Sequence, residues 1–180
     1  MVSLGAINFV CDGRLKHAPN PFAEKNLFQL KSTAKETKCD FDVCFDGDAD
    51  AMVVVNEQGK TVRNDLLTTL MAPYFLEQRS SATVVYDVLS SRVVSEEIIN
   101  GDGTPRRERL GHTYMIKAMR DSHAIVGGDL SGHFYFQGNF YSDSRFIALM
   151  HLINVMNTSE ASLSGRISPL KRYCASGELN

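Results

Sequence analysis

Residues 83–100 read TVVYDVLSSRVVSEEIIN, a pattern that indicates the class of fold. The first five, Thr83 to Asp87, form a continuous run typical of a strand that is buried on both faces of a parallel sheet. Ser90 or Ser91 can cap a helix that runs to the end of the stretch, and residues 101–103, Gly-Asp-Gly, predict a turn. A strand followed by a helix and a turn is the repeating unit of α/β folds.

The same alternation continues toward the C-terminus. Sequence patterns predict strands over 106–110, 124–126 and 134–137, and helices over 112–121 and 143–156. Strands that alternate with helices predict an α/β fold of layered, mixed sheets with helices, and we assign this domain to residues 63–165. Residues 166–180, which include Pro169, predict a linker that begins a further element.

The N-terminal third predicts a second, smaller unit. We expect a helix over 23–37 and two strands, 41–45 and 52–56, on either side of a short acidic loop. A further helix is expected over 64–78, where Pro73 should kink or divide it because proline lacks a backbone N–H. The pattern of strand, acidic loop and strand therefore precedes the α/β domain.

Composition limits the classes of partner. The chain has 180 residues, 43% of them hydrophobic, and a formal net charge of -2, so it provides no broad positive field for nucleic acid or an anionic membrane. No apolar run approaches the roughly 20 residues that span a bilayer. Four scattered cysteines favour a reducing cytoplasm, and Cys39 and Cys44 lack the second ligand pair of a zinc site. Any anionic ligand must be held locally.

The acidic loop between the two N-terminal strands contains alternating carboxylates. Asp46, Asp48 and Asp50 are separated only by Gly47 and Ala49. Carboxylates this close repel one another, so a bound cation would explain their arrangement. Hard oxygen ligands select Mg²⁺, Mn²⁺ or Ca²⁺ over zinc or copper. We expect Gly47 to permit a tight turn and the small Ala49 to leave room for the side chains to converge.

Two other interpretations of this loop stay open at the sequence level. In an EF-hand register that starts at Asp46, Glu57 falls at position twelve, but Ala51 replaces the glycine of position six and the flanks predict strands. Alternating aspartates also occur in ordinary solvated turns without an ion. A metal site is the favoured hypothesis.

A glycine-rich turn, residues 126–133, carries a second group of polar side chains. Asp129, Ser131 and His133 offer an acceptor, a hydroxyl and an imidazole from one short segment, a combination that suits the hydroxyl groups of a sugar. His112 follows Gly111 at a predicted helix start, where a side chain and backbone N–H groups could meet a phosphate or a hydroxyl. These four side chains are the candidate substrate ligands.

Taken together, these motifs resemble the α-D-phosphohexomutases, the phosphoglucomutase and phosphomannomutase family. The stretch 45–50, FDGDAD, resembles the family's magnesium loop, and 126–133, VGGDLSGH, resembles its sugar-binding loop. The Asn20-Pro21-Phe22 approach and the stretch from Leu110 to Lys117 also match in the right order. The resemblance implies a truncated domain 2 over residues 1–62, a domain 3 over 63–165 and the start of a missing domain 4 over 166–180.

The resemblance also implies a chemistry. Phosphohexomutases are isomerases that move a phosphoryl group between the 1- and 6-positions of a hexose phosphate through a phosphoserine and a hexose bisphosphate. Asp46, Asp48 and Asp50 would then bind Mg²⁺, while Asp129, Ser131, His133 and His112 would contact the substrate. The phosphorylated serine segment and the family's phosphate-binding segment do not occur in these 180 residues. We therefore expect this chain alone to be inactive.

Three substitutions depart from the family pattern. Ala51 stands where the metal loop usually continues with arginine, Leu89 stands where relatives often carry a basic residue, and Asp129 replaces the usual glutamate. Lost charges at a phosphoryl-transfer site weaken transition-state stabilisation. The alternative hypothesis is a non-catalytic remnant that binds metal or sugar phosphate. Self-association through the exposed edge of the truncated domain is also expected, and the choice of hexose is left open.

Overall fold

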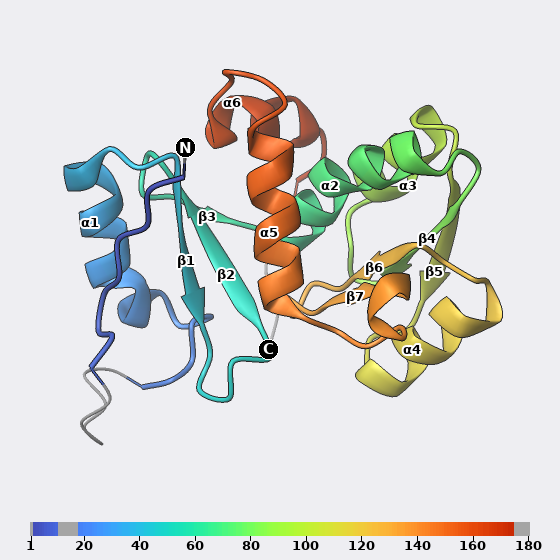
Figure 1. Cartoon of the computed structure of the whole chain (residues 1–180), viewed down its shortest axis with the longest axis horizontal. Coiled ribbons are helices and arrows are strands. Elements are labelled where there is room, and N and C mark those ends of the chain that lie inside the picture. Colours follow the sequence, from blue (N-terminus) through green and yellow to red (C-terminus); the bar gives the residue numbers. More distant parts are fainter. Residues whose placement is uncertain (1, 11–17, 175–180) are drawn as a thin grey trace.

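A computed structural model describes residues 2–10 and 18–174 of the chain. The described residues form two sheets, one of three strands and one of four. Figure 1 shows the sheets side by side, with helix α5 (Arg145–Met156) between them. The α/β fold of mixed sheets and helices predicted from the sequence is confirmed.

The smaller sheet is antiparallel and has the order β1-β2-β3, with strands at Phe41–Phe45, Met52–Asn56 and Thr61–Val62. A short 3-10 helix, η1 (Glu24–Leu27), leads into α1 (Phe28–Thr37), which packs against β1 and β2. The predicted helix over 23–37 therefore begins with a 3-10 turn. Every residue of β2 is buried, because β2 is the central strand of this sheet.

The larger sheet has the order β5-β4-β6-β7. Its strands lie at Thr83–Asp87 (β4), Thr104–Glu108 (β5), Val126–Gly128 (β6) and Phe134–Phe136 (β7). Strand β4 is parallel to β5 and β6, whereas β7 returns antiparallel to β6. The parallel strand predicted over 83–87 is confirmed, and two of its neighbours are shifted by two residues from their predicted bounds.

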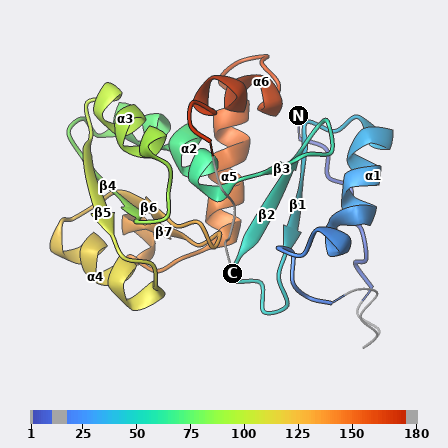
Figure 2. The ribbon, with the colours of Figure 1, turned by 180° about the vertical axis from the view of Figure 1, so that it is seen from behind.

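Helices cover both faces of the larger sheet. Figure 2 shows α2 (Asn64–Gln78) and α3 (Arg92–Asn100) on one side of it and α4 (His112–Asp121) on the other. Side chains of β4 alternate accordingly, since Val84 and Tyr86 belong to the core under α2 and α3, and Val85 packs with Met115 of α4. The result is a three-layer α/β/α arrangement.

One hydrophobic core continues from the larger sheet into the smaller one. Met52 and Val54 of β2 belong to the same buried cluster as Leu67 of α2 and Leu152 of α5. The smaller sheet is thus packed against the larger unit, and the loops at the ends of both sheets can be held in fixed positions.

The structure bears on two further expectations. Helix α2 is not divided at Pro73, because the residues around the proline, including Ala72 and Phe75, are anchored in the core. Residues 166–170, the first five of the expected linker, are helical, because α6 (Leu163–Ile167) extends into this segment and the 3-10 helix η3 (Ser168–Leu170) follows it. The buried side chains of Leu163 and Ile167 explain this helix, since they complete the core.

Candidate functional site

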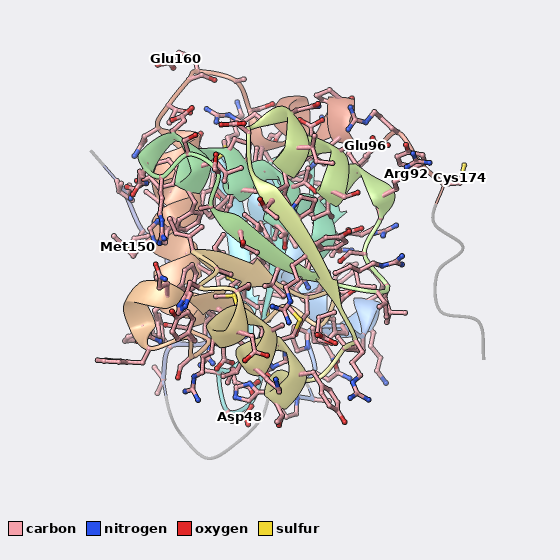
Figure 3. The ribbon with its side chains drawn as sticks, turned by 90° about the vertical axis from the view of Figure 1, so that its right-hand side faces the viewer. Asp48, Arg92, Glu96, Met150, Glu160 and Cys174 are labelled. Carbon is pink, nitrogen blue, oxygen red and sulfur yellow. The ribbon has the colours of Figure 1, made fainter. Side chains whose placement is uncertain are left out.

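The acidic loop joins β1 to β2 at one end of the smaller sheet. Asp46, Asp48 and Asp50 each offer a carboxylate oxygen, and these three oxygens lie within 4.8 Å of one another. Figure 3 shows Asp48 at one end of the molecule and Glu160, which lies between α5 and α6, at the opposite end. The predicted convergence of the three acids is therefore present in the fold.

The backbone of the loop is held by its own hydrogen bonds. The Ala51 amide donates to Oδ1 of Asp46 at 3.0 Å, and the Ala49 amide donates to the Asp46 carbonyl at 3.2 Å. The left-handed residue of the turn is Ala49, with φ 57, whereas Gly47 does not have a positive φ. Gly47 is required for a different reason, because a Cβ there would lie 2.9 Å from Cβ of Pro19.

Crowding of the acids separates their protonation behaviour. Burial alone would raise the pKa of Asp46, but hydrogen bonds from the Ala51 amide and with Asp50 outweigh it and lower this pKa. The hydrogen bond shared with Asp46, together with burial and the neighbouring negative charges, raises the pKa of Asp50. Two carboxylates that compete for one proton are a site where a cation lowers the free energy.

The glycine-rich loop between β6 and β7 lies directly against the start of β2. The Met52 amide donates to the Gly132 carbonyl at 3.4 Å. Gly132 has φ +88, and a Cβ at this position would lie 2.7 Å from the Met52 carbonyl oxygen and 3.0 Å from Nδ2 of Asn64. Only glycine fits this junction without displacement of its neighbours. The acidic loop and the glycine-rich loop, predicted separately from the sequence, are therefore in direct contact.

His133 connects the two loops electrostatically. Its Nε2 lies 3.7 Å from Oδ2 of Asp50, and its Nδ1 lies 3.4 Å from Oδ1 of Asp129. The hydrogen bond with Asp129 raises the pKa of His133, and the charges of Asp129, Asp50 and Asp143 add to this effect against the opposing contribution of burial. His133 thus sits between the acidic loop and the glycine-rich loop as a donor with a stabilised positive form.

Asp129 is turned into the protein. Its side chain is 2% exposed, Oδ1 accepts from the His133 amide at 3.1 Å, and Oδ2 accepts from the Tyr135 hydroxyl at 3.2 Å. Burial and the Asp129 carboxylate raise the pKa of Tyr135, so this phenol stays a donor. The Asp129 carboxylate therefore orders the loop through these two hydrogen bonds.

The other two predicted substrate ligands lie near this group. Ser131 is partly buried at the tip of the glycine-rich loop. His112, at the start of α4, has a side chain 55% exposed, lies 3.8 Å from Asp143 (Nδ1 to Oδ1), and has its ring centroid 5.6 Å from that of Tyr135. Tyr135 therefore lies close to both Asp129 and His112.

Sequence reasoning missed two residues that hold the loops in place. Asn64 donates from Nδ2 to the Leu130 carbonyl at 3.1 Å, and the buried Asp87 accepts from the amides of Leu89 and Leu130. Asp87 ends the predicted strand 83–87, and Asn64 begins the predicted helix 64–78. Leu130 lies 66 residues from Asn64 and 43 residues from Asp87. No local sequence pattern therefore indicated these two hydrogen bonds.

Among the described residues, the side chains considered for alternative metal sites have other partners. Glu57, the twelfth residue of the EF-hand register, accepts hydrogen bonds from the amide and hydroxyl of Ser164 instead of facing the acidic loop. The Cys39 thiol donates to Oδ2 of Asp42 at 2.9 Å. Across residues 2–10 and 18–174, the three aspartates form the single group of side chains that could hold a metal ion.

The donor set fits a hard divalent ion. In an octahedral site with metal–oxygen distances of about 2.1 Å, ligand oxygens lie about 3 to 4 Å apart. Three carboxylate oxygens already within 4.8 Å of one another need only small side-chain rotations to reach this spacing. A set of three carboxylates without thiol or imidazole ligands is typical of Mg²⁺, Mn²⁺ or Ca²⁺.

Comparison with known proteins adds a family to this geometry. Residues 63–173 match the family described as phosphoglucomutase/phosphomannomutase, alpha/beta/alpha domain III, and residues 2–59 match its alpha/beta/alpha domain II. A phosphomannomutase from Methanocaldococcus jannaschii is 34% identical over 175 residues, which cover 97% of this chain and 39% of that protein. A phosphoglucomutase from Neisseria meningitidis is 30% identical, over 91% of this chain and 36% of that protein.

Solved structures show the same similarity. A phosphoglucomutase/phosphomannomutase family protein from Burkholderia thailandensis superimposes with a TM-score of 0.80 at 26% identity, over 87% of this chain and 34% of that one. A structure described as a putative phosphomannomutase from Thermus thermophilus has the same fold, with a TM-score of 0.75 at 17% identity, over 86% of this chain and 35% of that one. The chain therefore spans little more than a third of the relatives that it matches.

Proposed function

Because this chain belongs to the phosphoglucomutase/phosphomannomutase family, we propose that it carries the magnesium loop and the sugar-binding loop of a hexose-phosphate phosphoryl-transfer enzyme. The observation that carries this proposal is the contact between the two loops. Asp50 of the acidic loop lies 3.7 Å from His133 of the glycine-rich loop, and Met52 and Gly132 share a backbone hydrogen bond. A metal ion and a sugar hydroxyl could thus be held next to each other.

Each proposed ligand has a distinct role. Asp46, Asp48 and Asp50 would hold Mg²⁺, which when bound supplies positive charge to a transferring phosphoryl group. Ser131 and His133 would contact sugar hydroxyls as donors or acceptors. His112 would contact the substrate from the start of α4, while Asp129 and Tyr135 would orient His133. Asp129 is therefore assigned a positioning role, since its carboxylate is buried.

Catalysis by the 180-residue chain alone is not expected. Ala51 and Leu89 lack the charges that the family pattern places beside the transferring phosphoryl group, and the phosphoserine segment is not among these residues. Missing preorganised charges raise the barrier to phosphoryl transfer. A coupled assay that follows conversion of glucose 1-phosphate or mannose 1-phosphate to the 6-phosphate tests this, and turnover above background would contradict it.

Binding can be tested apart from turnover. Titration calorimetry with Mg²⁺, and then with glucose 1,6-bisphosphate in the presence of Mg²⁺, should release or absorb heat if both loops are competent. Absence of a signal for both ligands would refute the proposal. A second experiment supplies the family's phosphoserine and phosphate-binding segments as a separate polypeptide. If the chain then binds both ligands but still shows no turnover, the alternative of a non-catalytic metal- or sugar-phosphate-binding remnant is favoured.

Partners and location follow from the same proposal. The expected ligands are a hexose phosphate or hexose bisphosphate, and the proposed compartment is the cytoplasm. Within the described ranges, 2–10 and 18–174, no helix combines the length and apolar character needed to cross a membrane. Self-association remains a prediction, supported by large apolar side chains near the N-terminus that are more than half exposed: Val2, Leu4, Phe9, Val10 and Phe28.

A further inference from the structure

Positive charge is concentrated in one short part of this nearly neutral chain. Residues 105–120 contain five lysines or arginines and one acidic residue, whereas the whole chain has a net charge of -2. Arg106 and Lys117 share the carboxylate of Asp121 in α4, with Nη2 of Arg106 3.9 Å from its Oδ2. The exposed Arg107 guanidinium forms no ion pair with any residue of the described ranges. It is therefore available to an external anion.

The position of this guanidinium is defined by a hydrogen bond. Arg107 lies next to Tyr86 in the register of β5 and β4, and its Nη2 donates to the carbonyl oxygen of Val88, just beyond the end of β4. The loop that follows β4 presents two apolar side chains to solvent, because Val88 is 41% and Leu89 is 56% exposed. The Arg107 guanidinium thus lies beside the exposed apolar tip of this loop, which Val88 and Leu89 form and which we call the Val88–Leu89 tip.

This loop is fixed next to the glycine-rich loop. The Asp87 side chain is fully buried, and its Oδ1 accepts from the amides of Leu89 and Ser90, each at 2.7 Å. Its Oδ2 accepts from the amide of Leu130, the residue before Ser131. One carboxylate therefore clamps both loops at the carboxyl edge of the parallel strands, which is the edge where open α/β sheets bind ligands.

A phosphorylated sugar presents apolar C–H groups and an anion to its binding site. Exposed Val88 and Leu89 can pack against C–H groups, and a guanidinium can form two parallel hydrogen bonds to a phosphate. We propose that Arg107 and the Val88–Leu89 tip form a subsite for a phosphate group of the hexose bisphosphate or hexose phosphate. This inference rests on the proposed function and adds a residue that selects phosphorylated over unphosphorylated sugar.

The test compares charge-matched variants of the full 180-residue chain by calorimetry in Mg²⁺. Arg107→Gln should weaken the affinity for glucose 1,6-bisphosphate about tenfold, because it removes a charge-assisted, bidentate contact. The affinity of Arg107→Lys should lie between those of the wild type and Arg107→Gln, since lysine keeps the positive charge but lacks the planar guanidinium. Arg120→Gln, at the far end of α4 and therefore at the opposite edge of the sheet, should bind the bisphosphate like the wild type.

Two further readouts separate a binding role from a structural one. The variants should keep the wild-type affinity for Mg²⁺ and the wild-type circular dichroism spectrum, because the acidic loop and the sheet are not altered. Unchanged bisphosphate affinity in Arg107→Gln, equal losses in Arg107→Gln and Arg120→Gln, or no bisphosphate binding by the wild type would overturn the inference. If the wild type does not bind Mg²⁺ but Arg107→Gln still weakens bisphosphate binding, only the proposed metal site is refuted.

Discussion

Replacement of Gly132 by alanine should break the junction between the acidic loop and the glycine-rich loop. At φ +88 an L-residue is strained, which costs about 1 kcal/mol or more. The new methyl group would lie 2.7 Å from the Met52 carbonyl oxygen and 3.0 Å from Nδ2 of Asn64. Displacement of packed neighbours costs a further 1–3 kcal/mol, so we expect a total loss of about 2–4 kcal/mol.

A loss of this size is measurable because a domain is stable by only about 5–15 kcal/mol. Urea denaturation followed by circular dichroism should show a lower midpoint with an unchanged slope. Gly138→Ala is the matched control, since a Cβ at Gly138 has no neighbour within 4 Å. That variant should stay within about 0.5 kcal/mol of the wild type. Equal stability of the Gly132 and Gly138 variants would refute the argument that the two loops are in steric contact.

Three other perturbations test separate parts of the structure. Asp50→Asn should weaken Mg²⁺ binding about tenfold or more, measured by calorimetry, whereas Asp40→Asn, an exposed acid outside the loop, should not; equal affinities would argue against a shared ion. Burial lowers the pKa of His151, which packs 4.5 Å from the Phe75 ring, so the unfolded state binds the proton more readily and stability should fall as the pH drops below about 6.5. Because the raised pKa of His133 acts in the opposite direction in the same pH range, the test compares two proteins: the urea midpoint of His151→Leu should rise relative to that of the wild type as the pH falls from about 7.5 to about 5.5. A difference between the two midpoints that does not change with pH would contradict the assignment. Burial would raise the pKa of Glu57, but hydrogen bonds from Ser164 outweigh burial and lower it. The stability that these hydrogen bonds contribute is therefore present above about pH 4.5 and is lost as the pH falls through the lowered pKa. Glu57→Gln should then cost about 1 kcal/mol at neutral pH, and additivity with Ser164→Ala in a double-mutant cycle would show that the two residues are not coupled.

The sequence determined the fold class and the composition of both loops. Period-2 and helical patterns, Ser91 as a cap and the run from Thr83 to Asp87 indicated alternating strands and helices, because these signals act between residues that are close along the chain. The alternating aspartates of 46–50 likewise indicated a cation site, since their repulsion depends only on local spacing.

Only the tertiary structure decided how the two loops meet. The hydrogen bond between Met52 and Gly132 and the bond from the Leu130 amide to Asp87 both join residues that are far apart in sequence. The path of α2 through Pro73 was also settled by packing, because core burial on both sides of the proline outweighs one missing hydrogen bond. Local spacing fixes which groups can bind, whereas long-range packing fixes which of them face a ligand.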